Sequence, residues 1–148
     1  MDFLEKAIVG FVTKFSKDIQ VDLNPELVVF YRENRTIQRK PVIYVEKKVG
    51  KPKLLGFGDD FYMNENHLRI DVFDFKEVET TTSLDPQECL TAFFRSCIRD
   101  LTGLGALVKP RIIVRNIDSL RNLLPENTES VVETALIESG ARECVFVT

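Results

Sequence analysis

The N-terminal residues carry an amphipathic pattern that predicts an α-helix over residues 2–17. Its apolar positions recur at the spacing that gathers them on one helical face: Phe3, Leu4, Ala7, Ile8, Phe11, Val12 and Phe15. The charged residues within and beside this segment sum to zero, whereas helices that lie on membranes usually carry excess Lys and Arg. We therefore expect this face to pack on this domain or on a second copy, with peripheral membrane contact as the alternative.

Short apolar runs separated by turn residues follow this helix and predict a meander of strands. The predicted strands cover residues 19–23, 27–31, 36–39, 42–45 and 53–57. Residues 58–67 read as a loop with a helical turn at 60–64, and residues 68–75 alternate in the manner of an extended segment. Residues 76–83 are polar and rich in threonine, so they give only a weak structural signal.

The second half of the chain alternates helices and strands. Asp85, Pro86 and Glu88 form a strong helix start, and Gly103 suits the helix end. An apolar strand is predicted over 111–114, and a short helix from Asp118 through residue 124. Further elements are a helix that begins at residue 127 or 128 and ends near 140, and a final strand over 144–147.

This order predicts one α/β domain over residues 1–148, with a mixed sheet of about five strands and flanking helices. We expect the first three strands to be antiparallel. Strand 111–114 should lie beside the first strand and strand 144–147 outside it, because a right-handed crossover joins parallel strands. The predicted core consists of Val21, Leu23, Val29, Ile43, Val45, Leu90, Phe93, Phe94, Cys97, Ile112, Val114, Val132, Leu136 and Val145.

Composition narrows the functional classes. A net charge of −3 argues against broad nucleic-acid binding, which needs many phosphate-neutralising side chains. The local basic run from residue 35 to residue 53 is interpreted as a solvated hairpin edge. Cys89, Cys97 and Cys144 have no metal-ligand spacing and fit a reducing cytoplasm. His67 is interpreted as a surface residue without an obvious partner, and Asp59-Asp60 as solvated carboxylates, so we expect no metal site.

Four segments resemble the first subdomain of MreB, a family of bacterial actins that determines cell shape. They are residues 14–23, 37–45, 109–114 and 135–147, and the last contains the most specific match, Gly140-Ala141-Arg142-Glu143. The resemblance implies an actin-like, ribonuclease-H-like half domain. It also implies a phosphate loop after the first strand and an N-terminal segment on the inner face of the membrane.

The sequence departs from that family at the nucleotide site. Asp22 matches the family's strand-end aspartate, but Asn24, Pro25 and Glu26 stand where the family has a Gly-Thr phosphate loop. Proline removes an amide donor and Glu26 adds a negative charge, so we interpret this stretch as a degenerate remnant. Residues 115–127 replace the family's catalytic turn, and the sequence ends before a second phosphate loop. We expect no enzyme activity and no nucleotide cofactor.

The leading hypothesis is a non-catalytic, cytoplasmic, actin-like interaction domain with a structural or regulatory role, linked to the cell-shape cytoskeleton. Its partners would be a second copy in a homodimer, an actin-like filament or the membrane surface. Two alternatives remain open: half of an ATPase site that another chain completes, and a generic α/β regulatory module that binds proteins. Asp22 is interpreted as a local capping residue rather than as a group that holds a metal-bound nucleotide. Asp118 is likewise interpreted as a helix cap rather than as a general base.

Overall fold

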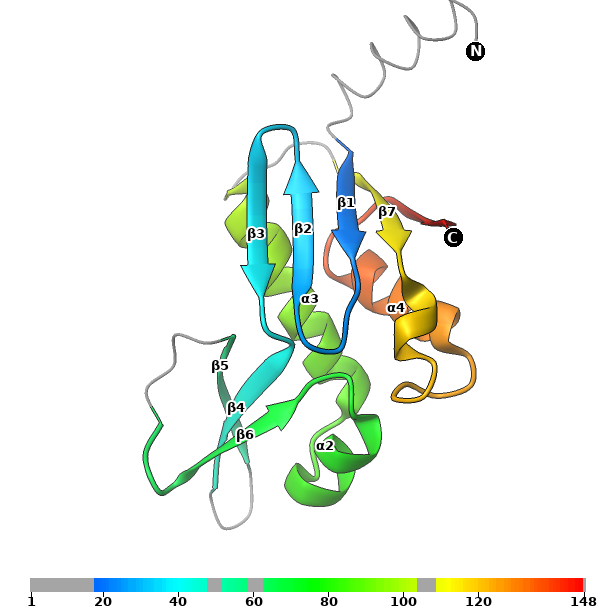
Figure 1. The fold of residues 1–148 in the computed structure, drawn as a ribbon. Coiled ribbons are helices and arrows are strands. Elements are labelled where there is room, and N and C mark those ends of the chain that lie inside the picture. The colour runs from blue at the N-terminus through cyan, green and yellow to red at the C-terminus, as the bar shows by residue number, and fades with distance from the viewer. Residues whose placement is uncertain (1–17, 48–51, 59–62, 104–108, 148) are drawn as a thin grey trace, which may run out of the picture.

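The computed structural model describes residues 18–47, 52–58, 63–103 and 109–147. The predicted helix over 2–17 lies outside these residues, as do Asp59 and Asp60. Two β-sheets and three α-helices make up the described chain, and Figure 1 shows the larger sheet above the smaller one. None of the described helices is long and apolar enough to cross a membrane.

The larger sheet has five strands in the order β3-β2-β1-β7-β8. Their bounds are β1 (Ile19–Asp22), β2 (Val28–Arg32), β3 (Arg35–Arg39), β7 (Arg111–Arg115) and β8 (Glu143–Val147). β1, β2 and β3 are antiparallel, whereas β7 runs parallel to both β1 and β8. This arrangement confirms the predicted mixed sheet and the predicted position of its last two strands.

A second sheet of three strands was not predicted as a separate unit. It consists of β4 (Val42–Glu46), β5 (Lys53–Phe57) and β6 (His67–Asp71), in the order β5-β4-β6. The break follows from Pro41, which has no amide to continue the ladder from β3. The Val42 N–H instead donates to the Lys40 carbonyl at 2.8 Å, a tight turn that directs β4 away from the larger sheet.

Three α-helices cover the sheets: α2 (Phe75–Thr82), α3 (Pro86–Thr102) and α4 (Thr128–Glu138). The Asp85 side chain accepts from the Gln87 N–H and caps α3 as predicted, and Gly103 ends it at φ +76°. The weak prediction for residues 76–83 missed α2. Asp74 is its cap, accepting from the Glu77 N–H at 3.1 Å, and lies just before the window that was judged polar.

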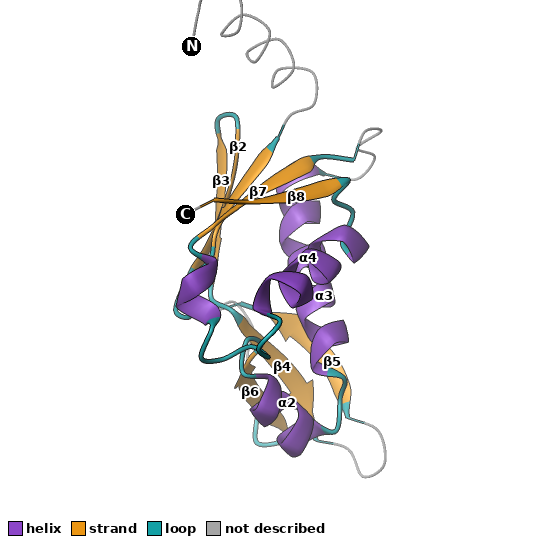
Figure 2. Cartoon of the chain, turned by 90° about the vertical axis from the view of Figure 1, so that its right-hand side faces the viewer, coloured by secondary structure: helices purple, strands orange, loops and turns teal. Residues whose placement is uncertain are grey.

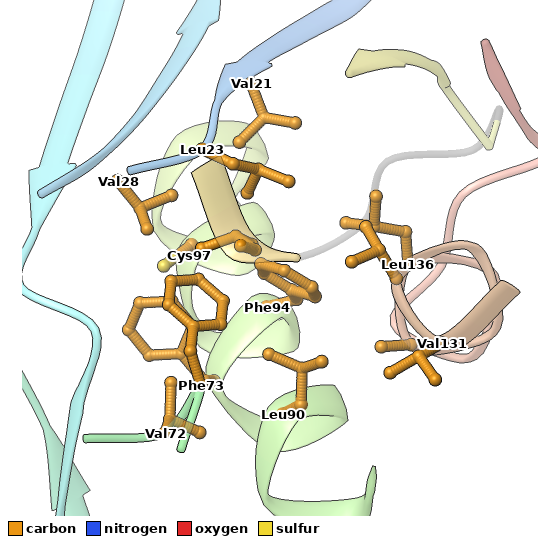
Figure 3. Close-up of a cluster of buried hydrophobic side chains, with 14 of the residues drawn as sticks. Val21, Leu23, Val28, Val72, Phe73, Leu90, Phe94, Cys97, Val131 and Leu136 are labelled. Atoms are coloured by element: carbon orange, nitrogen blue, oxygen red, sulfur yellow. The ribbon is translucent and has the colours of Figure 1, made fainter. Parts of the chain in front are cut away.

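The two sheets share one core through five phenylalanines. Phe93 and Phe94 of α3 lie with ring centres 5.8 Å apart. Phe94 packs edge-on against Phe30 of the larger sheet at 6.2 Å, and Phe93 packs edge-on against Phe57 of the smaller sheet at the same distance. Phe73 contacts both α3 rings, at 6.4 Å each. Figure 3 shows Phe94 and Phe73 within this cluster of apolar side chains.

The prediction of burial is wrong for two of the predicted core residues, Val29 and Val145. The sheet alternates its faces along each strand, so a shift of one residue exchanges buried and exposed positions. In β2 the buried residues are Val28 and Phe30, and Val29 is only half-buried. In β8, Val145 is 40% exposed, whereas the other twelve predicted core residues are buried.

Candidate functional site

The loop after β1 is the place where the sequence suggested a degenerate phosphate site. Asp22 is half-buried at the strand end, and Asn24 and Glu26 are exposed beyond it. The Asn24 side chain accepts the Glu26 N–H at 2.9 Å, closing a local turn around Pro25. The structure thus brings all four predicted residues into one short loop, in which Asn24 satisfies the backbone of Glu26.

The same loop is fixed to the turn that follows β7. The Leu23 N–H donates to the Arg115 carbonyl at 3.0 Å. The Leu23 carbonyl accepts from Asn116 Nδ2 at 2.8 Å and from Ser119 Oγ at 3.0 Å. Asn116 adopts φ +67°, a left-handed conformation that asparagine tolerates better than most residues. Both backbone polar groups of Leu23 are therefore occupied within the protein.

Phosphate binding by this loop would depend on backbone N–H groups that are not already hydrogen-bonded within the protein. Phosphate cradles use several neighbouring N–H groups that point into one concavity. Here the Leu23 and Glu26 amides are engaged, and Pro25 has none, so only Asn24 among these four residues retains an unassigned N–H. The exposed carboxylate of Glu26 adds negative charge. These hydrogen bonds close the loop on itself and on the turn after β7.

Asp118 does not cap a helix, contrary to the prediction. It is the second residue of the 3₁₀ helix η1 (Ile117–Leu120), and Asn116 occupies the preceding cap position without a side-chain capping bond. The Asp118 carboxylate instead accepts from Arg121 Nε at 2.5 Å, and Arg121 Nη2 reaches Glu129 at 2.9 Å. These hydrogen bonds raise the pKa of Arg121 above its ordinary value. Residues 115–127 are thereby linked to the first turn of α4.

The described cysteine and histidine side chains are the groups to consider for nucleophilic or metal-binding chemistry. Burial raises the pKa of Cys89 to about 11 and that of Cys97 to about 12, so both thiols stay protonated near neutral pH. His67 has a partner, contrary to expectation: its Nδ1 accepts the Asn64 N–H at 3.2 Å. Within the described ranges, no three His, Cys, Asp or Glu side chains are placed to hold a metal ion.

A cavity of about 300 Å³ lies between the smaller sheet and α2, and no sequence pattern predicted it. Its apolar lining comes mainly from Val45, Pro52 and Leu68, while Glu46 and Lys47 also line it. The Thr82 hydroxyl at its wall already donates to the Val78 carbonyl and accepts the Leu84 N–H. The cavity can accommodate an apolar group, with the charged residues Glu46 and Lys47 at its wall.

The larger sheet has one covered and one uncovered face. Figure 2 shows α3 and α4 on the same side of the strands, and no described α-helix lies on the other. We call this second side the outer face. The strand registers place Tyr31, Gln20, Ile113 and Val145 in one row across it. Tyr31 is 38% exposed and Val145 is 40% exposed, so the row presents apolar surface to solvent.

Comparison with solved structures identifies the fold. The chain is similar to MreB5 of Spiroplasma citri bound to ADP, with a TM-score of 0.61 and 10% identity, over 87% of this chain and 37% of that one. It is also similar to the same protein bound to AMPPNP, with a TM-score of 0.52 and 10% identity, over 86% and 37% of the two chains. No family model and no curated protein matches the sequence.

These similarities show an actin-like α/β fold that corresponds to part of MreB5. At 10% identity they establish the architecture and not the chemistry. The described residues span the segments on which the resemblance to MreB rested, except for the start of the first segment. The chain spans 37% of the length of the MreB5 structures, so the activity of the whole protein does not transfer with the fold.

Proposed function

We propose that this chain is a non-catalytic interaction domain built on an actin-like subdomain, with a structural or regulatory role linked to the actin-like cell-shape cytoskeleton. Its partners are other protein surfaces, either a second copy or an actin-like filament. The proposal does not include nucleotide hydrolysis.

The observation that carries the proposal is the closed loop at Leu23. Its N–H and carbonyl are held by Arg115, Asn116 and Ser119, in the position where the resemblance would require amides open to phosphate. Opening this loop would break three hydrogen bonds, each contributing about 1 kcal/mol. Phosphate binding would have to offset that cost and the repulsion from Glu26. This weighs against the alternative of an ATPase half-site.

The apolar side chains in the outer-face row support an interaction role. Single exposed apolar residues are ordinary, whereas several on neighbouring strands of one face form a larger contact surface. Ile113 and Val145 are neighbours in this row, and the exposed side chain of Gln20 separates them from Tyr31. Aromatic residues such as Tyr31 are enriched at protein interfaces. Generic α/β modules have similar surfaces, so the filament partner needs a direct test.

Two measurements on the full chain test the proposal. Calorimetric titration with Mg-ATP should show no binding at micromolar concentrations, with MreB5 as the positive control. Co-sedimentation with a polymerised MreB-type protein should carry the chain into the pellet, compared with a pellet of unrelated filaments. A micromolar dissociation constant for Mg-ATP would overturn the non-catalytic assignment.

A matched variant separates the loop from the fold. Asn24→Gly with Pro25→Thr restores the glycine and hydroxyl of the family's loop, and Asn116→Ala with Ser119→Ala removes the side chains that hold Leu23. If the fourfold variant gains Mg-ATP binding while the parent has none, the closed loop is the cause. If neither binds, the loop alone does not account for the lack of binding.

A further inference from the structure

The two edge strands of the larger sheet differ in chemistry. β3 carries Arg35 and Arg39, and both side chains reach Asp100 near the end of α3: Arg35 Nη2 donates to its carbonyl at 3.0 Å, and Arg39 forms an ion pair with its carboxylate. Charged side chains on an edge strand are a common means of preventing pairing with another sheet. The β3 edge is thus protected.

The β8 edge carries a single charged side chain, Glu143, at its first residue. Its five residues, Glu143–Val147, include four apolar side chains and no Lys, Arg or Pro. Val145 at its centre is the most exposed large apolar residue in the described part of the chain. Figure 2 looks onto this edge and shows β8 at the front of the sheet. Such a strand offers unpaired backbone groups to another strand.

We propose that β8 pairs in antiparallel orientation with β8 of a second copy, about a twofold axis at Val145. The two five-stranded sheets then join into one continuous sheet. This inference rests on the proposed interaction role and names its partner and surface. Centring the pair on Val145 is the register that aligns all five residues of both strands, since Val145 is the midpoint of β8.

This register continues the row of the outer face across the axis. Val145 lies beside Ile113 in its own sheet. Pairing places it directly opposite Val145 of the second copy, so Ile113 and Val145 of each copy form one stripe. On the covered face, Cys144 comes opposite Phe146 of the second copy. Both are half-buried and pack against the core, so pairing covers their remaining exposed parts.

Charge complementarity favours the antiparallel orientation. In the sheet, Arg115 lies beside Val147. The proposed register sets Glu143 of the second copy on the other side of Val147, in the same row of the outer face. Arg115 and that glutamate are then two strands apart, about 10 Å, which their combined side-chain lengths can span. Arg115 and Glu143 are both exposed, and symmetry repeats the pair.

The opposite orientation lacks this complementarity. A parallel pair in register would place Glu143 beside Glu143 of the second copy, which is unfavourable. A twofold axis also makes the contact self-limiting, because the same edge is used on both copies and β3 remains protected. The expected product is a dimer and not a fibre.

Cross-linking at the axis tests the geometry in the full chain. Val145→Cys in a Cys144→Ala background places two thiols directly opposite each other, at a Cβ separation close to that of a disulfide. Diamide oxidation at tens of micromolar should convert most of the protein to a disulfide-linked dimer. Thr36→Cys with Cys144→Ala is the matched control, an exposed position on the β3 edge, and should form no disulfide-linked dimer.

A charge exchange supplies a second, independent measurement. Sedimentation velocity should show that Arg115→Glu and Glu143→Arg each weaken dimerisation by about tenfold. The double variant should restore most of the affinity of the parent, and circular dichroism checks that each variant is folded. Equal cross-linking at positions 36 and 145, or a double variant weaker than both single variants, would overturn β8 pairing.

These outcomes remain distinct from those of the proposed function. A monomeric chain that still co-sediments with an MreB-type filament overturns the β8 dimer and leaves the interaction role in place. A dimer with micromolar affinity for Mg-ATP supports the edge pairing and overturns the non-catalytic assignment.

Discussion

The two faces of the five-stranded sheet are made from the same strands and have different consequences. The covered face carries residues such as Val21, Val114 and Phe30, all fully buried beneath α3 and α4. The outer face carries Tyr31 and Val145, which keep more than a third of their surface in contact with solvent. A single residue step along a strand therefore separates a side chain that stabilises the core from one that is available to contact another protein.

The largest effect is expected where the covered face meets both sheets. Phe94→Ala removes a fully buried ring that contacts Phe30, Phe73 and Phe93. We expect a loss of about 3–5 kcal/mol in the free energy of unfolding, because a cavity would remain among rigid neighbours. Denaturant unfolding measures it. A loss below about 1 kcal/mol would show that the ring is not central to the core.

A smaller effect is expected from a polar change on the covered face. Val114→Thr keeps the shape of a fully buried side chain but introduces a hydroxyl. We expect a loss of about 2 kcal/mol, since burial of an unpaired hydroxyl costs roughly 1–3 kcal/mol. Val114→Ala is the control, because it removes volume without adding polarity. Equal stability of the threonine variant and the parent would contradict the assignment of this face.

An intermediate effect is expected at the loop after β1, where Asn116 holds the Leu23 carbonyl. Asn116→Ala loses the hydrogen bond to the Leu23 carbonyl and places a Cβ-bearing residue without a polar side chain at φ +67°. We expect a loss of about 1–2 kcal/mol, part from the bond and part from the left-handed backbone. Asn116→Gly separates the two causes, since glycine accepts this conformation. If glycine and alanine behave alike in thermal unfolding, backbone strain contributes nothing.

The smallest effect on stability is expected on the outer face. Val145→Thr is the same substitution as Val114→Thr, placed on the neighbouring strand but at a position that is 40% exposed. We expect the free energy of unfolding of the monomer to change by less than about 0.5 kcal/mol. Chemical unfolding at low protein concentration, where dimers do not form, provides the measurement. A loss as large as that of Val114→Thr would show that another element covers Val145.

The sequence was sufficient for most of the larger sheet and its helices. The apolar stripe of α3, its Asp85 cap and the strand order follow from local patterns and from the handedness of crossovers. The errors at Val29 and Val145 arose because the short strands β2 and β8 are apolar at consecutive positions, so alternation does not mark the buried face. Only pairing with neighbouring strands decides it.

The site was less predictable than the fold. Asn24, Pro25 and Glu26 marked the unusual loop, and the structure places them together. The hydrogen bonds from Asn116 and Ser119 to the Leu23 carbonyl were not predicted, because these two residues are more than 90 positions away from Leu23. The cavity beside α2 was missed for a similar reason, since its lining comes from β4, β6 and α2. Contacts between distant segments carry no local sequence signal.

The adjacent rings of Phe93 and Phe94 have a consequence for how the protein unfolds. One helix turn presents one ring to each sheet, so neither sheet can lose its packing without exposing the same short segment of α3 to water. The two sheets therefore behave as one cooperative unit, although the chain passes between them through the tight turn at Pro41. Heating should produce a single calorimetric transition, and hydrogen exchange at β2 and at β4 should report the same opening event.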